Sequence, residues 1–274
     1  MALSELEFDY VRRLVYEGSA IVLEPTKSYL AETRLIQLAR QEGLTTVSDL
    51  VARMRGASCN NGLHRRVVEA MTTNETSFFR DIHPFDAMKG AVMPALVEQR
   101  RDTRALDIWS AACSTGQEAY TIAMVLREHF PELASWKVRI LCTDLSRDVL
   151  EKARSGRYGQ LEVNRGLPAT LLVKYFKRDG LHYQVKDDLR QMMDFREMNL
   201  ATAWPSLPRM DVVFLRNVLI YFDVATKRRI LAGVRDLLRP DGVLFLGGAE
   251  TTLNLDDGFE RVVVGKATCY RLRR

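Results

Sequence analysis

The residues best suited to chemistry follow a short, mostly apolar run in the middle of the chain. Residues 105–112 are typical of a buried strand in a parallel sheet. They lead into Cys113-Ser114-Thr115-Gly116, small residues that permit a tight turn and the close approach of a ligand. Apolar residues then recur at helical spacing, at Ala119, Ile122, Ala123 and Leu126. We therefore expect a strand, a small-residue loop and a helix, as at the start of a nucleotide-binding sheet.

The loop does not carry the full glycine pattern of dinucleotide-binding turns. Ala112, Ser114 and Gly116 stand where glycines are expected, and only the last is glycine. By itself this stretch fits a cofactor turn and an ordinary α/β turn about equally well.

A second strand is predicted over residues 137–146, with Asp144 near its carboxyl end. In doubly wound folds an acidic residue at this place accepts hydrogen bonds from the ribose of the cofactor. Asp144 follows Gly116 by 28 residues, which leaves room for a helix between them. Helix capping is the alternative role, and the small-residue loop favours the ribose role.

The remaining pattern predicts an α/β fold of the class I S-adenosylmethionine-dependent methyltransferase type. Residues 210–215 begin a strand, apolar except for Asp211, that ends in Arg216-Asn217, and residues 237–250 predict a helix end, a Pro-Asp-Gly turn and another strand. Residues 259–272 complete the sheet as an antiparallel hairpin. A small antiparallel insert is predicted at about 172–195, with a turn at Arg178-Asp179-Gly180 and a strand around 191–195.

The amino-terminal part predicts a separate, all-helical domain over residues 1–72. Ser4 and Glu7 form a capping box ahead of the first helix, and three further helices are expected near 28–42, 46–56 and 63–71. Residues 73–81 are a polar linker, in which Asn74, Thr76 and Arg80 offer hydrogen-bonding groups to a cofactor cleft. A lead-in helix at 84–100 opens the methyltransferase domain, residues 82–274.

Composition leaves several classes of partner open. No apolar run approaches the roughly 20 residues of a membrane span, and the acidic amino terminus is unlike a signal peptide, so we expect a cytoplasmic protein. The four cysteines and four histidines are scattered, which favours reduced structural thiols and no metal. A net charge of +5 and a pI near 9.1 suit an acidic partner, either nucleic acid or protein.

Basic residues are concentrated in the helical domain. Between Lys27 and Arg66 there are seven basic and three acidic residues. This bias is consistent with a solvated helical surface or with a docking surface for an acidic partner.

Several blocks in order make the chain similar, from end to end, to the chemotaxis receptor methyltransferases of the CheR family. The blocks are NETSFFR (74–80), SAACSTGQEAYTIAM (110–124), LCTDLS (141–146) with VLEKARSGRY (149–158), FREMNL (195–200), FLRNVLIYFD (214–223) and LLRPDGVLFLGGAE (237–250).

The resemblance implies methyl transfer from S-adenosylmethionine to glutamate side chains of chemoreceptors, with S-adenosylhomocysteine as the product. It implies a cofactor site of nine residues: Asn74, Thr76, Arg80, Glu118, Asp144, Asn199, Leu200, Arg216 and Asn217. Asp144 would hold the ribose, while Asn199 and Leu200 would flank the adenine. Arg80 and Tyr221 would lie near the reacting methyl as the catalytic pair.

The resemblance also gives the basic helices a use. Arg34, Arg40, Arg53 and Arg55 would dock the acidic methylation helices of receptors, and a regulatory protein is a possible further partner. Relatives that bind a carboxyl-terminal receptor pentapeptide carry a longer, glycine-rich loop in the insert. The short Arg178-Asp179-Gly180 turn therefore predicts an enzyme that is independent of such a tether, recruited to membrane-bound receptor arrays.

Two alternatives remain. A nucleic-acid methyltransferase of the amino-directed type needs a D/N-P-P-Y/F turn, but this chain has Asn217-Val218-Leu219-Ile220-Tyr221, without proline, and no cysteine follows a proline as in C5 enzymes. A non-catalytic module that only binds S-adenosylmethionine is the other alternative, against which Arg80, Asp144 and Tyr221 argue.

Overall fold

The structure is a computed structural model that describes residues 3–56 and 62–273. The chain divides into two compact units, each described here by itself. One comprises residues 1–73 together with 221–226, and the other comprises 74–220 together with 227–274. None of the helices in the described ranges is both long and apolar enough to cross a membrane.

The first unit is helical, and its first helix begins at the predicted capping box. The Glu7 N–H donates to Ser4 Oγ at 3.3 Å, and the Ser4 N–H donates to the Glu7 carboxylate at 2.8 Å. Val11, Leu35, Leu50 and Val67 meet in a fully buried core. Its elements are α1 (Glu5–Ser19), η1 (Pro25–Lys27), α2 (Ser28–Gln41), α3 (Val47–Gly56) and α4 (Gly62–Met71).

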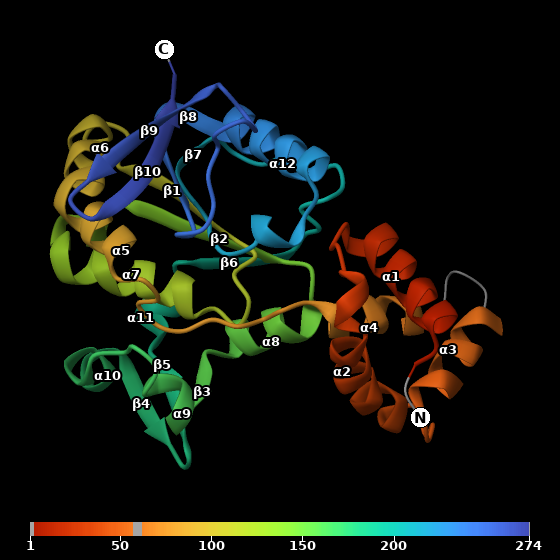
Figure 1. Ribbon diagram of the computed structural model, residues 1–274. Helices are drawn as coiled ribbons and strands as arrows, with labels where there is room; N and C mark the ends of the chain where they lie inside the picture. Colours follow the sequence, from red (N-terminus) through yellow and green to blue (C-terminus); the bar gives the residue numbers. More distant parts are fainter. Residues whose placement is uncertain (1–2, 57–61, 274) are drawn as a thin grey trace. The chain divides into compact units, whose positions relative to one another are not determined.

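The second unit is built on a seven-stranded sheet with the order β6-β2-β1-β7-β8-β10-β9 (Figure 1). The first five strands in this order pair in parallel, and β10 is antiparallel to both of its neighbours. This confirms the predicted class I methyltransferase sheet and its terminal hairpin. The strands are β1 (Ala105–Ala111), β2 (Lys137–Asp144), β6 (Met193–Glu197), β7 (Met210–Leu215), β8 (Leu238–Leu246), β9 (Phe259–Val264) and β10 (Ala267–Leu272).

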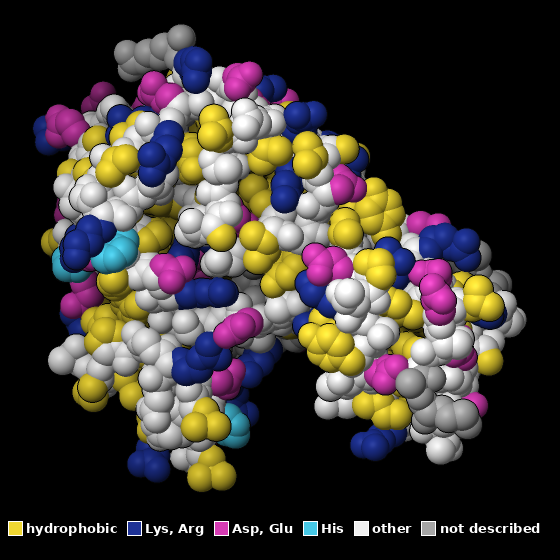
Figure 2. All heavy atoms as spheres, in the orientation of Figure 1, with side chains coloured by type: hydrophobic (Ala, Val, Ile, Leu, Met, Phe, Trp, Pro, Cys, Tyr) yellow, Lys and Arg dark blue, Asp and Glu magenta, His cyan; other side chains and the backbone are white. Residues whose placement is uncertain are grey.

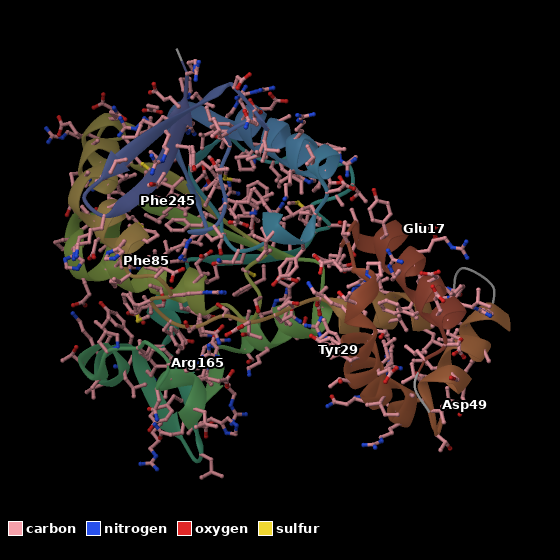
Figure 3. All side chains as sticks on the ribbon, viewed as in Figure 1. Glu17, Tyr29, Asp49, Phe85, Arg165 and Phe245 are labelled. Carbon is pink, nitrogen blue, oxygen red and sulfur yellow. The ribbon has the colours of Figure 1, made fainter. Side chains whose placement is uncertain are left out.

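Helices cover both faces of this sheet, with α6 and α12 on opposite sides (Figure 1). Phe85 of α5 stacks on Phe214 of β7, with 5.9 Å between ring centroids, and Phe214 stacks on Phe245 of β8 at 4.8 Å (Figure 3). The helical elements are α5 (His83–Ala87), η2 (Met88–Val92, a π-helical segment), α6 (Met93–Gln99), α7 (Gln117–His129), η3 (Pro131–Ser135), α8 (Arg147–Ser155), η4 (Leu219–Tyr221) and α12 (Val224–Leu237). The predicted lead-in helix therefore exists, with a π-helical segment in its middle.

The antiparallel insert differs from the prediction in its strands. Its sheet has the order β3-β5-β4, and the predicted turn at Gly180 has a left-handed φ of 59°. The strand predicted at 191–195 as part of the insert was placed wrongly, because β6 pairs in parallel with β2 at the edge of the main sheet. The residue pattern of 191–195 predicts a strand but does not reveal that its pairing partner is β2, about 50 residues earlier in the chain. The insert contains β3 (Arg157–Gly159), α9 (Gln160–Val163), α10 (Ala169–Tyr175), β4 (Phe176–Asp179), β5 (His182–Val185) and α11 (Asp187–Arg190).

The Pro-Asp-Gly turn predicted before the last parallel strand is found as an irregular segment within that strand. Pro240, Asp241 and Gly242 lie inside β8, where the pairing with β7 shifts register between Met210 and Val212. Arg100 holds Asp241 through two hydrogen bonds, at 2.8 and 2.6 Å. This long-range ion pair joins the irregular segment to the end of α6.

Candidate functional site

The loop between β1 and α7 alternates left-handed residues. Ala112, Ser114 and Gly116 have φ values of 56°, 51° and 93°. These are the three positions at which the sequence predicted glycine-like behaviour, and two of them adopt this conformation with a side chain present. An added Cβ at Gly116 would lie 2.9 Å from Ala153 Cβ, so this position requires glycine. Strained backbone of this kind is concentrated at binding sites.

Asp144 joins this loop to the carboxyl end of β2. Its Oδ2 accepts the Ser114 N–H at 2.8 Å, and its Oδ1 accepts the Ser146 N–H at 3.0 Å. The side chain is buried, with the residue 7% exposed. These two contacts orient the carboxylate at the start of the β1 loop.

The segment after the helical unit is bound to the same loop. The Asn74 carbonyl accepts a hydrogen bond from Ser114 Oγ at 2.8 Å, and the Phe79 N–H donates to Thr121 Oγ1 on α7 at 3.1 Å. Thr76 and Arg80 are half-buried on this segment. Arg80 Nη1 donates to the Glu75 carbonyl at 2.8 Å. The segment that carries Asn74, Thr76 and Arg80 is therefore joined to the β1 loop at Asn74 and to α7 at Phe79.

Arg216, at the end of β7, is the centre of a buried polar cluster. Its Nη1 donates to Glu118 Oε2 at 3.0 Å, and Glu118 Oε1 accepts Ser110 Oγ at 2.8 Å. Its Nη2 donates to the Arg80 carbonyl at 2.9 Å and to Asp81 Oδ2 at 3.1 Å. The side chain of Arg216 is only 2% exposed. Two predicted site residues, Glu118 and Arg216, thus form an ion pair that also fixes the backbone of Arg80.

Glu250 is a positioning residue that the sequence reasoning did not single out. Its carboxylate accepts the N–H groups of Asn217 at 2.8 Å, Val218 at 2.9 Å, Leu219 at 2.7 Å and Gly247 at 2.6 Å. Asn217, a predicted site residue, has a left-handed φ of 57°. The only signal in the sequence was that Glu250 ends the block LLRPDGVLFLGGAE. Its role depends on the approach of two strand ends.

Asn199 and Leu200 lie just beyond the carboxyl end of β6. Asn199 Oδ1 accepts the Ala201 N–H at 2.9 Å, and the Leu200 carbonyl accepts the Trp204 indole N–H at 3.1 Å. Trp204 packs edge-on against Trp109 of β1, with 5.1 Å between ring centroids. These contacts hold the predicted adenine-flanking residues at the same edge of the sheet as Asp144.

Tyr221 is placed with the helical unit rather than with the other predicted site residues. Its carbonyl accepts the Val22 N–H at 2.9 Å. In the same unit, Tyr16 donates its hydroxyl to Asp223 at 2.7 Å. The hydrogen bonds from Thr226 and Tyr16 lower the pKa of Asp223. The pairing of Tyr221 with Arg80 remains a prediction.

The four predicted docking arginines differ in their surroundings. Arg34 donates to the carbonyls of Met71 at 2.6 Å and Thr72 at 3.0 Å, and burial lowers its pKa. Arg53 pairs with Glu42 at 3.2 Å. Arg55 donates to the Leu6 carbonyl at 3.0 Å and lies over a tyrosine ring. Arg40 is exposed on α2. Arg34 is thus part of the helical framework, and the other three are on the surface.

The described cysteines are buried thiols. Cys113, Cys142 and Cys269 are free, whereas Cys59 lies outside the described residues. A hydrogen bond with Cys142 and burial raise the pKa of the Cys113 thiol. A protonated, buried thiol is a poor nucleophile, which agrees with a structural role.

Comparison with known proteins matches both units. The model of the CheR methyltransferase all-alpha domain matches residues 6–72, and that of the CheR methyltransferase SAM-binding domain matches residues 74–267. The chain belongs to the CheR methyltransferase family. It is 39% identical to chemotaxis protein methyltransferase 1 of Pseudomonas aeruginosa, with complete coverage of both chains. It is 38% identical to chemotaxis protein methyltransferase Cher2 of Pseudomonas putida over 100% of both chains.

A further relative extends the similarity beyond pseudomonads. The chemotaxis protein methyltransferase of Vibrio parahaemolyticus is 36% identical, covering 100% of this chain and 99% of the relative. These matches confirm the resemblance noted in the sequence. The protein is an S-adenosylmethionine-dependent methyltransferase of chemotaxis, and neither a nucleic-acid enzyme nor a non-catalytic binding module is favoured.

Proposed function

We propose that this CheR-family enzyme transfers the methyl group of S-adenosylmethionine to the γ-carboxylate of glutamate side chains in chemoreceptors. The observation that carries the proposal is the match of both units, at full length, to chemotaxis protein methyltransferases. The products are a glutamate methyl ester and S-adenosylhomocysteine.

The residues at the carboxyl edge of the sheet fit the proposed cofactor. Asp144 presents an oriented, buried carboxylate, as recognition of the two ribose hydroxyls requires. The loop with left-handed backbone at Ala112 and Ser114 lies beside this carboxylate, and Leu200 is proposed to supply an apolar surface for a base. The other groups assigned to the site are Asn74, Thr76, Arg80, Glu118, Asn199, Arg216 and Asn217.

The reaction needs little acid–base chemistry from the protein. Bound S-adenosylmethionine supplies an electrophilic methyl group on a sulfonium. A glutamate carboxyl has a reference pKa of about 4.3, so the nucleophile is ionised at neutral pH without a general base. The residues of the site therefore act by aligning the carboxylate and by excluding water.

Arg80 and Tyr221 are the groups proposed to orient the target carboxylate. The Arg216 cluster fixes the Arg80 carbonyl and thereby the start of its side chain. A guanidinium and a phenol hydroxyl both donate hydrogen bonds to a carboxylate. Too strong an ion pair between Arg80 and the glutamate carboxylate would also stabilise the bound substrate before reaction. The contact must therefore align the carboxylate without binding it tightly.

The surface arginines of the helical unit are proposed to attract the acidic methylation helices of receptors. Arg40, Arg53 and Arg55 supply this charge, whereas the contribution of Arg34 is mainly to the framework. We also propose that the enzyme acts without a receptor pentapeptide tether, because the turn at Arg178-Asp179-Gly180 is short. Recruitment to receptor arrays and control by a regulatory protein belong to the same proposal.

The test is incubation of the enzyme with tritiated S-adenosylmethionine and receptor-containing membranes, followed by mild alkali. Volatile methanol released from a receptor-sized band is the expected result, because a carboxyl methyl ester hydrolyses under these conditions. Alkali-stable label, or label on added RNA alone, would overturn the proposal. Receptors with and without a terminal pentapeptide should be methylated at similar rates, and a strict requirement for the pentapeptide would contradict tether independence.

A further inference from the structure

A groove of about 640 Å³ lies on the methyltransferase unit, beside the Arg216 cluster. Asp81, Pro84 and Arg216 line one end. The loop of residues 247–257 and the β9–β10 hairpin line the rest. None of the roles assigned above uses this hairpin.

The groove and the proposed cofactor residues occupy two halves of one sheet edge. Asp144 and Asn199 lie at the carboxyl ends of β2 and β6, whereas the groove starts at the ends of β7 and β8 and runs along the β9–β10 hairpin. Because β10 is antiparallel to β8, the turn that leads into β10 lies at this same edge. Arg216 is shared between the two halves.

This arrangement suits a displacement at a methyl group. The attacking atom must approach from the side opposite the leaving sulfur, so the nucleophile and the cofactor require separate entrances that meet at one point. A glutamate side chain is short, and the polypeptide on either side of it therefore needs a surface next to that point. The groove supplies such a surface.

The charges in the groove favour an acidic occupant. Three of its acidic side chains are already held: Asp81 by Arg216, Asp256 by Arg235, and Glu250 by backbone N–H groups. Asp257 is exposed at the rim.

The basic side chains of the rim are free to act on a partner. Arg261, Lys266 and Arg273 are exposed, and within residues 3–56 and 62–273 none of them forms an ion pair. Arg261 donates to Thr268 at 3.0 Å. In Figure 2, Lys and Arg side chains lie over β9 and β10 beside hydrophobic ones.

We propose that this groove seats the acidic polypeptide segment that flanks the target glutamate of the receptor, with Lys266 and Arg273 pairing with its carboxylates. The inference rests on the proposed function, since it assigns the substrate of that reaction a second contact surface. It adds a docking surface on the methyltransferase unit to the one proposed on the helical unit.

The test compares Lys266→Glu/Arg273→Glu with a control, Arg101→Glu/Lys137→Glu, which makes the same charge change at two residues that do not line the groove. The groove variant should raise the receptor KM by about tenfold at low salt, and less at high salt, with S-adenosylmethionine affinity unchanged. The control should keep the wild-type KM. Equal receptor KM values for the wild type and the groove variant would overturn the proposed docking role of the groove.

A cross-linking experiment gives an independent readout. Leu253 lines the groove and is 71% exposed, so p-benzoylphenylalanine at this position should be tolerated. Irradiation should link it to the receptor, whereas the same probe at Lys137 should not. A link only to a second enzyme molecule, or none to the receptor, would contradict the proposal. If the wild-type enzyme forms no alkali-labile receptor ester, the proposed function itself fails, whatever the groove binds.

Discussion

Glu250 holds the backbone of Asn217, its Oε2 accepting the Asn217 N–H at 2.8 Å. The same oxygen accepts the Gly247 N–H, so one carboxylate joins the ends of β7 and β8. An added Cβ at Gly247 would lie 2.7 Å from this oxygen, which shows how closely the two strand ends approach. Asn217 is one of the proposed cofactor residues, and this contact holds its backbone N–H while its φ is left-handed, at 57°.

Glu250→Gln should therefore destabilise the enzyme and lower its turnover. Gln can offer only one accepting oxygen and would point donors at two N–H groups, which costs about 2 kcal/mol or more of the free energy of unfolding. Urea denaturation measures the loss. Glu98→Gln, which removes an exposed partner of Arg101, should cost under about 1 kcal/mol. Equal effects of both substitutions would contradict the role of Glu250.

Asp144→Asn should weaken S-adenosylmethionine binding by about 10- to 100-fold, as expected for the loss of a charged hydrogen-bonding partner of the ribose. Isothermal titration calorimetry of the purified enzyme measures this. Asp148→Asn, in the first turn of α8, is the matched control and should leave the affinity unchanged. Wild-type affinity for Asp144→Asn would refute the ribose assignment.

Arg80→Ala should remove much of kcat/KM, and Tyr221→Phe should remove less, because a phenol contributes a weaker contact to the carboxylate than a guanidinium. Methyl-ester formation with saturating S-adenosylmethionine measures both. Full activity of the two variants would rule out the proposed catalytic pair. Arg165→Ala, which removes the exposed partner of Glu75, should retain activity.

Reversing two exposed charges of the helical unit, Arg40→Glu with Arg55→Glu, should raise the receptor KM several-fold at low salt. The effect should shrink as salt screens the charges. The receptor titration is repeated at two ionic strengths, with Arg101→Glu/Lys137→Glu as the control. An unchanged KM at low salt would leave the basic helices without a docking role.

Asp241 provides a pH-dependent test of the fold, because the hydrogen bonds from Arg100 lower its pKa. A carboxyl whose pKa is lowered by folding stabilises the folded state at any pH above its pKa in the unfolded chain. This stabilisation is lost as the pH falls through the pKa of the folded state. Asp241→Asn should thus lower the free energy of unfolding near pH 7. Below about pH 4, its free energy of unfolding should fall less steeply with pH than that of the wild type. Unfolding free energies measured from pH 7 to pH 3 would contradict this if the two curves ran parallel. Burial raises the pKa of the neighbouring Asp211, so ionisation of Asp211 has the opposite effect on stability. This effect is present in the wild type and in Asp241→Asn alike.

The sequence determined the elements whose signals are local. The capping box at Ser4, the apolar strands and the Asp-Gly turn of the insert all follow from neighbouring residues. It also indicated the positions of the β1 loop, because small residues at 112, 114 and 116 tolerate the left-handed backbone that the loop adopts.

Tertiary structure decided what depends on distant partners. The place of β6 beside β2, the irregular β8 held by Arg100, and three of the four backbone hydrogen bonds of Glu250 join residues far apart in the chain. The hydrogen bond from Arg34 to the Met71 carbonyl, at the end of α4, likewise joins residues that are distant in the chain. Such pairings follow from packing of the whole sheet or bundle, and no periodicity along the chain encodes them.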